Sequence, residues 1–330
     1  MRASLRDNVG PLVLEWRLWI KTKRPAVQIF FHEDYSVCRL SMGTKRILVT
    51  NDDGIHADGL KALERSLAAV GTVTVVAPDR EMSATSQSIS VHTPLRVYAF
   101  DERHYAVTGT PADAVIIAIH HILKERPHLV VSGINPGGNL GENVVYSGTV
   151  AAAMEATLHG VPALAVSLAS RKHLDFSGAA AFAAQLAEKI LGEGLPPGVM
   201  LNVNVPRGEV RGVRITRQSQ KISQNLVHEK FDPRGRPYFW LDETARLETA
   251  EPDSDYAAIR AHEISITPLQ VDRTDYKSIE RLADWLTALQ VSAQYCRLEA
   301  GANRTLALAQ WADLPHSSLI EIPSQPLLHL

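Results

Sequence analysis

Short apolar segments alternate along the chain with segments in which apolar residues recur every three or four positions. Residues 47–50 form the first apolar segment, and Leu60, Leu63, Leu67 and Val70 follow it at helical spacing. Strands that alternate with amphipathic helices are typical of a parallel sheet. The pattern therefore predicts an α/β fold with a Rossmann-like, mostly parallel sheet and helices on both faces.

The same pattern predicts the other strands and helices. Further strands are expected at residues 73–77, 129–134, 163–168, 200–205, 213–215 and 263–267. A β-hairpin at the sheet edge is expected at residues 95–100 and 105–108. Helices are expected at residues 111–123, 149–158 and 175–191, and on the face formed by Ile279, Leu282, Leu286 and Leu289.

The chain changes character after Gly192. Residues 226–241 are polar and aromatic around the turn sequence Asp232-Pro233-Arg234-Gly235, which predicts a protruding β-hairpin. We expect residues 42–290 to form one domain that includes this hairpin and a C-terminal helix at 276–290.

The two ends of the chain lack the strand and helix alternation. Residues 1–41 hold Trp16 and Trp19, and residues 291–330 contain three prolines that oppose both helix and central strand. Met42 precedes the first expected strand, so we hypothesise that translation starts there and that residues 1–41 are not part of the native protein. The alternative for either end is a mobile arm or a partner-binding segment.

Composition excludes several classes of protein. The net charge of −2 and the lack of a basic stripe argue against binding to a nucleic-acid duplex. No apolar run approaches the roughly 20 residues of a membrane span. The only cysteines, Cys38 and Cys296, are far apart, which favours a reduced, cytoplasmic protein. Neither a Gly-x-Gly-x-x-Gly sequence after the first strand nor a P-loop sequence is present.

Two adjacent carboxylates follow the first strand. Asp52 and Asp53 come directly after residues 46–50, where the buried strand should end. Neighbouring carboxylates near a protein interior repel each other and are costly to desolvate, and a shared cation removes both problems. Ligands bind at the carboxyl ends of strands in open α/β sheets. We therefore predict a hard metal ion at the end of this strand.

Four segments should meet at this edge of the sheet. They are residues 51–54, 77–86, 132–139 and 146–149. They offer carboxylate, hydroxyl and amide oxygens without clustered histidine or cysteine, which suits Mg²⁺, Mn²⁺ or Ca²⁺ better than a structural zinc ion.

The segment Ser147-Gly148-Thr149 begins a helix and suggests an anion site. A hydroxyl-rich N-cap leaves backbone N–H groups pointing outward, and the helix dipole favours an anion there. Alone this is an ordinary helix cap. A divalent cation beside it would complete the minimum equipment for phosphate-ester chemistry. His56 lies near the aspartates, where a capping role is simpler than proton donation.

At these segments the sequence resembles the SurE survival proteins, the stationary-phase 5'/3'-nucleotidases. The resemblance covers about residues 45–290 and neither terminus. Its most specific matches are Thr50-Asn51-Asp52-Asp53-Gly54-Ile55-His56-Ala57, Ala77-Pro78-Asp79-Arg80, Ser132-Gly133-Ile134-Asn135 and Tyr146-Ser147-Gly148-Thr149-Val150-Ala151-Ala152-Ala153-Met154-Glu155.

The resemblance implies a metal-dependent phosphatase that acts on nucleoside 5'- and 3'-monophosphates with one divalent ion per subunit. It implies that the metal ligands are Asp52, Asp53, Ser83 and Asn135. It also places around the phosphate Asn51, Ser86, Ser147, Gly148 and Thr149. The family forms dimers and tetramers through a swapped C-terminal segment and an extended hairpin, so a homodimer or homotetramer is expected.

The mechanism that we predict uses Asp52, Asp53 and Asn51 as catalytic residues. One of the two aspartates orients or deprotonates water, and Asn51 donates a hydrogen bond to the phosphate. Two alternatives remain open. The first is a non-catalytic protein that binds a nucleotide through the same cation, and the second is a phosphatase for another ester such as short polyphosphate.

Overall fold

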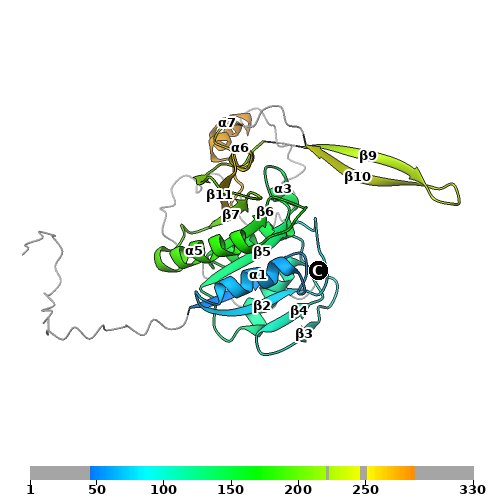
Figure 1. Ribbon diagram of the computed structural model, residues 1–330. Helices are drawn as coiled ribbons and strands as arrows, with labels where there is room; N and C mark the ends of the chain where they lie inside the picture. The colour runs from blue at the N-terminus through cyan, green and yellow to red at the C-terminus, as the bar shows by residue number, and fades with distance from the viewer. Residues whose placement is uncertain (1–44, 221–222, 246–250, 287–330) are drawn as a thin grey trace, which may run out of the picture.

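The fold is built on a nine-stranded mixed sheet with helices on both faces (Figure 1). The computed structural model describes residues 45–220, 223–245 and 251–286. In sheet order the strands are β3 (Val97–Ala99), β4 (His104–Val107), β2 (Thr72–Pro78), β1 (Arg46–Thr50), β5 (Leu129–Pro136), β6 (Ala163–Leu168), β7 (Val199–Val205), β11 (Glu263–Gln270) and β8 (Gly212–Ile215).

The central strands are parallel, as predicted. Neighbours from β4 through β2, β1, β5 and β6 to β7 all pair in the same direction. β3 pairs antiparallel with β4 and forms the expected edge hairpin. At the other edge β11 runs antiparallel to β7, and β8 lies parallel to β11. The α/β fold class is therefore confirmed.

Strand β1 is buried on both faces because helices cover both. Ile47 and Val49 pack in the core under α1 (Asp58–Leu67) and α5 (Ser177–Glu193), which lie side by side in Figure 1. Leu48 points to the opposite core, beneath α2 (Pro111–Ile117) and α4 (Gly148–Leu158). A continuous apolar strand is what burial on both faces requires.

The helix predicted at 111–123 is present but changes character before its end. Thr110 and Asp113 form a capping box at the start of α2, with each side chain accepting from the other residue's backbone N–H. After Ile117 the helix continues as a single π-helical turn, η1 (Ala118–Ile122). Two short helices were not predicted, α3 (Asn143–Tyr146) and α6 (Asp255–Arg260).

The predicted hairpin is present and projects away from the sheet (Figure 1). Its strands β9 (Ser223–Phe231) and β10 (Pro237–Ala245) pair antiparallel as a separate two-stranded sheet. Asp232 closes the turn by accepting from the backbone N–H groups of Arg234 and Arg236. The last helix among the described residues, α7, spans Tyr276–Leu286. Several predictions concern residues that the structure does not describe. They are the start of translation at Met42, the two terminal segments 1–41 and 291–330, and the end of the C-terminal helix, which includes Leu289.

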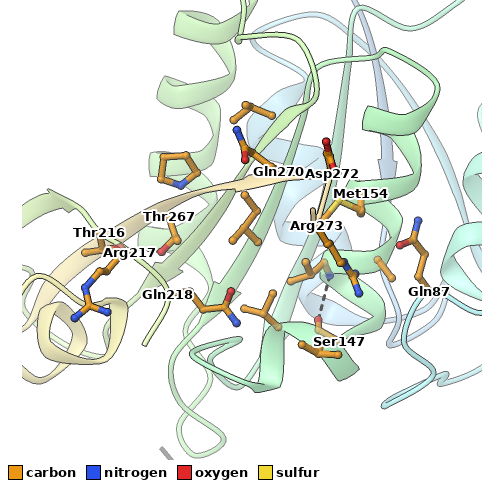
Figure 2. Close-up of a pocket in the computed structure, with 17 residues that line it drawn as sticks. Gln87, Ser147, Met154, Thr216, Arg217, Gln218, Thr267, Gln270, Asp272 and Arg273 are labelled. Atoms are coloured by element: carbon orange, nitrogen blue, oxygen red, sulfur yellow. Dashed lines mark hydrogen bonds between the residues drawn. The ribbon is translucent and has the colours of Figure 1, made fainter. Parts of the chain in front are cut away.

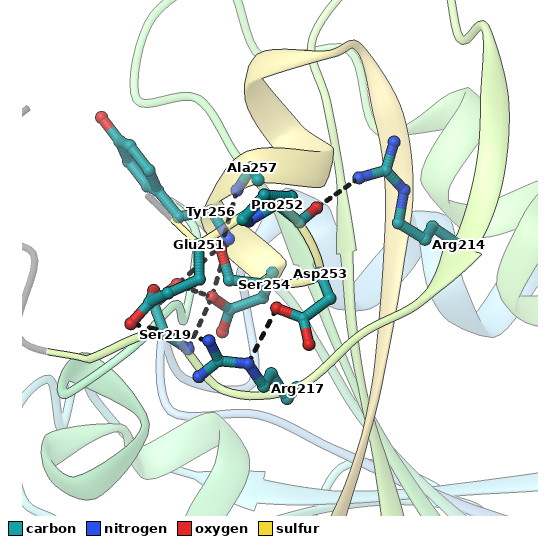
Figure 3. Close-up of polar contacts among 10 residues, drawn as sticks. Arg214, Arg217, Ser219, Glu251, Pro252, Asp253, Ser254, Tyr256 and Ala257 are labelled. Carbon is teal, nitrogen blue, oxygen red and sulfur yellow. Dashed lines mark hydrogen bonds and ion pairs between the residues drawn. The ribbon is translucent and has the colours of Figure 1, made fainter. Parts of the chain in front are cut away.

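Polar contacts attach α6 to the loop that follows β8 (Figure 3). Arg217 Nε donates to Asp253 at 2.8 Å, and Arg214 Nη1 donates to the Pro252 carbonyl at 2.8 Å. Asp255 is fully buried, where it accepts from the N–H of Ser219 at 3.1 Å and from that of Gly141 at 3.0 Å. The C-terminal part of the domain thus holds the loop between β5 and α3.

Candidate functional site

The predicted site lies where the chain changes direction within the sheet. After β1 the chain adds β2 and β4 on one side, then returns to place β5 on the other side of β1. Thr50 and Ser132 are register partners near the carboxyl ends of these two strands. Such a reversal leaves a crevice at the strand ends, where open α/β sheets bind ligands.

Asp52 is held by two other segments of the site. Its backbone carbonyl accepts from the N–H of Met82 at 2.7 Å, which fastens the loop after β2 to the loop after β1. Its carboxylate accepts a hydrogen bond from the hydroxyl of Thr149, in the first turn of α4. Asp52 is only 4% exposed, so this hydroxyl partly compensates for a buried charge.

Gly148 allows this close approach. A Cβ atom built on Gly148 would lie 2.7 Å from the Cβ of Asp52 and 3.1 Å from the Cγ of Pro111. Glycine is therefore the residue that fits between the N-terminus of α4 and β1. Ser147 caps the same helix, with its hydroxyl oxygen accepting from the N–H of Val150 at 3.1 Å.

Both aspartates hold their protons more tightly than usual. Burial raises the pKa of Asp52, although hydrogen bonds from Thr149 oppose the shift. Burial, the charge of Asp52 and the charge of Glu81 together raise the pKa of Asp53 to about 7. Glu81 was not among the predicted site residues. Its effect on the aspartates could have been anticipated only from its position two residues before the predicted ligand Ser83.

The donor set fits a hard cation. Asp53 Oδ2 and Asp79 Oδ1 are buried and have no hydrogen-bond partner among the described residues. Unpaired buried carboxylate oxygens are rare unless a cation or water satisfies them. Across the described ranges no group of three or more His, Cys, Asp or Glu side chains could hold a metal ion. Hydroxyl and amide oxygens would therefore have to complete the ligand set.

Ser83 and Asn135, the other two predicted ligands, lie on separate loops. The Ser83 hydroxyl donates to Glu81 at 2.7 Å, in an exposed part of the loop after β2. Asn135 is the penultimate residue of β5, and its Nδ2 donates to the carbonyl of Gly137 at 2.7 Å, so this contact does not engage the amide oxygen. The structure thus ties Ser83 to Glu81, whose charge acts on both aspartates.

Two predicted phosphate-binding residues make other contacts. Asn51 is fully buried and closes the loop after β1, because its side chain bonds both the N–H and the carbonyl of Gly54. Ser86 donates its hydroxyl to the carbonyl of Val145 at 2.8 Å, just before the cap of α4. The phosphate contacts of both residues stay predictions.

A comparison with family models assigns the chain to a family. Residues 47–225 match the model of the family described as Survival protein SurE. The chain belongs to the SurE family.

Curated relatives support the assignment. The chain is 49% identical over 259 residues to the protein named 5'-nucleotidase SurE of Geobacter sulfurreducens, covering 77% of this chain and 97% of that one. It is 49% identical to the 5'-nucleotidase SurE of Moorella thermoacetica over 74% of this chain and 96% of the relative. The solved SurE protein from Aquifex aeolicus matches with a TM-score of 0.67 and 37% identity, covering 73% of this chain and 99% of the other.

A cavity of about 570 Å³ is lined in part by Ser147, the N-cap of α4 (Figure 2). Val150, Ala151 and Met154 of α4 form its apolar wall, and Arg273 and Gln87 add polar groups. None of the four predicted metal ligands lines it. The cavity therefore touches the proposed phosphate site at Ser147 and includes none of the proposed metal ligands.

Proposed function

We propose that this SurE-family protein is a metal-dependent phosphatase that hydrolyses nucleoside 5'-monophosphates, and 3'-monophosphates, to nucleoside and phosphate. The names of its relatives supply the activity. The observation that carries the proposal is the contact between the Asp52 carboxylate and the first turn of α4. It puts a group that attracts a cation beside a helix end that attracts an anion.

Asp52, Asp53, Ser83 and Asn135 would hold the divalent ion, one per subunit. The unpaired Oδ2 of Asp53 and the oxygen-rich donor set support Mg²⁺ or Mn²⁺, with Ca²⁺ as a weaker candidate. A bound ion of this kind neutralises phosphate oxygens and lowers the pKa of a coordinated water.

Side chains at the site would also bind the phosphate, position the aspartates and take up a proton. The N-terminus of α4, at Ser147, Gly148 and Thr149, orients the phosphate and stabilises its negative charge. Thr149 keeps Asp52 in place, and one of the two aspartates would orient or deprotonate the attacking water. Asn51 fixes the loop that carries both aspartates, and its second amide hydrogen and Ser86 are proposed to contact the phosphate.

The test is phosphate release from AMP and GMP by EDTA-treated protein, with and without added Mn²⁺ or Mg²⁺. We expect activity only with the metal, and loss of activity in Asp52→Asn and Asp53→Asn. Asp58→Asn is a matched control, since Asp58 is exposed in the first turn of α1. Full activity in both site variants would refute the proposal.

A substrate panel separates the alternatives. A non-catalytic nucleotide-binding protein would bind AMP with metal but release no phosphate. A phosphatase for another ester would release phosphate faster from short polyphosphate than from AMP or 3'-AMP. Comparing the rates for AMP and GMP in the same panel shows which base the protein prefers.

We also propose that the protein forms homodimers or homotetramers and works in the cytoplasm. The hairpin exposes Phe239, Trp240 and Leu241, and α7 exposes Tyr276 and Trp285, as expected of surfaces that a partner covers. A C-terminal helix exchanged between subunits would use the α7 face. Light scattering of the wild type and of Trp240→Glu tests this, because an unchanged mass in the variant would show that the hairpin is not the surface between subunits. None of the helices described is long and apolar enough to span a membrane.

A further inference from the structure

Two histidines meet on the surface at the ends of two helices. His120 lies in the turn η1 that follows α2, and His159 caps the C-terminal end of α4. Nε2 of His120 is 3.3 Å from Nδ1 of His159, and the ring centroids are 4.8 Å apart. His120 is exposed and the His159 side chain is 28% exposed, so solvent reaches both rings.

We propose that His120 and His159 form a second metal site, for a transition-metal ion such as Zn²⁺, Cu²⁺ or Ni²⁺. Two nitrogen ligands bound to tetrahedral zinc at about 2.0–2.1 Å lie about 3.3–3.4 Å apart. The observed separation of 3.3 Å matches this spacing and is long for a hydrogen bond between two rings. The ion would take the place of the shared ring proton.

Glu155 prepares His159 for this role. Its Oε1 lies 3.2 Å from Nε2 of His159, and its Oε2 accepts from Nε2 of Gln87 at 3.1 Å. A carboxylate beside one ring nitrogen keeps the proton there, which leaves the lone pair of the other nitrogen free for a metal. Glu155 is 8% exposed and held by Gln87, so it is a fixed positioning residue for His159 Nδ1.

The charges around the pair favour a cation. Both histidines lie at C-terminal helix ends, where unpaired carbonyl groups carry partial negative charge. The guanidinium of Arg126 lies beside Gly160 and opposes a cation, but Arg126 is exposed and its field is screened by water. The balance therefore permits a metal held by two imidazoles and by water.

Donor chemistry separates this site from the one at Asp52 and Asp53. Imidazole nitrogen prefers zinc, copper and nickel, whereas the oxygen set prefers magnesium and manganese. The two sites also lie at opposite ends of α4, since Thr149 is in its first turn and His159 is its C-cap. Ion binding at the histidine pair thus does not depend on the proposed phosphatase activity.

The test is calorimetric titration of Zn²⁺ into the full chain without a histidine tag, in millimolar Mg²⁺ to occupy the oxygen site. We expect a zinc site that His120→Ala and His159→Ala each weaken by at least about tenfold. His121→Ala is the matched control, because His121 is an exposed neighbour on the same turn and should bind zinc as the wild type does. Circular dichroism checks that each variant is folded.

Two further measurements make the test independent of variant stability. Electron paramagnetic resonance of wild-type protein with one equivalent of Cu²⁺ should show coupling to two imidazole nitrogens. Glu155→Gln should weaken zinc binding while leaving the number of sites unchanged. The proposal is overturned if the wild type binds no zinc under these conditions, or if His120→Ala and His121→Ala affect binding equally.

Discussion

The hydroxyl of Thr149, in the first turn of α4, donates a hydrogen bond to the carboxylate of Asp52, at the end of β1. The two residues are 97 positions apart in the chain. This contact joins the proposed cation site to the proposed phosphate site.

Thr149→Val should reduce phosphate release without unfolding the protein. The substitution keeps the shape of the side chain but removes a hydrogen bond to a charged group, which contributes roughly 1.5–3 kcal/mol. We expect kcat/KM for AMP with Mn²⁺ to fall about tenfold to a hundredfold. Thr149→Ser keeps the hydroxyl and should retain most of the activity, so equal losses in the two variants would contradict the prediction.

Gly148→Ala should disrupt the site by steric contact. The new Cβ would lie 2.7 Å from the Cβ of Asp52, so α4 or the loop after β1 has to move. We expect a loss of activity and a destabilisation of about 1–3 kcal/mol, measured by urea unfolding. Gly192→Ala in α5 is the control, since nothing lies within 4 Å of its Cβ, and it should raise stability by up to about 1 kcal/mol.

Asp53→Asn should stabilise the metal-free protein at neutral and alkaline pH. The pKa of Asp53 rises from 3.8 to about 7 in the folded state, so the ionised form destabilises the fold. That cost is absent below pH 3.8 and grows as the pH rises toward 7. At pH 8 in EDTA we expect a gain on the order of 1–2 kcal/mol by urea unfolding, after allowance for solvent screening.

Added Mn²⁺ gives this prediction its control. The metal should raise the melting temperature of the wild type, because it binds the folded state only. It should not do so for Asp53→Asn. If the Asp53→Asn variant is less stable than the wild type in EDTA at pH 8, the charge of Asp53 does not lower the free energy of unfolding.

His104→Gln should destabilise the protein more at pH 6 than at pH 9. Burial alone would lower the pKa of His104, but hydrogen bonds to Asp101 and Glu64 outweigh it and raise the pKa above 6.5. A raised pKa means that the stabilisation is complete below the unfolded value and is lost as the pH rises through the folded value. We expect a difference of about 0.5–1 kcal/mol between the two pH values.

Urea unfolding at both pH values measures the effect of His104→Gln. His92→Gln is the control, since His92 is exposed. It should change stability equally little at pH 6 and pH 9. A His104→Gln variant with the same loss at both pH values would mean that the contacts of His104 do not depend on its charge.

Some of the site was predictable because its signals are local. The apolar segment before Asp52 and Asp53 ends abruptly, so the end of a buried strand with two carboxylates, where α/β sheets bind ligands, could be located from the sequence. The capping residue Ser147 was predictable for the same reason, since a helix cap involves only residues close together in the chain. In contrast, α6 has six residues, too few for a helical period to appear.

The sequence by itself determined the strands, most helices, the hairpin and the chemical types at the strand ends, because burial imposes a period on each segment separately. Only the tertiary structure decided which side chains meet. The Thr149 contact with Asp52, the effect of Glu81 on Asp53 and the pairing of His120 with His159 all depend on how α2 and α4 pack against the sheet. That packing joins residues far apart in the chain, and no local pattern records it.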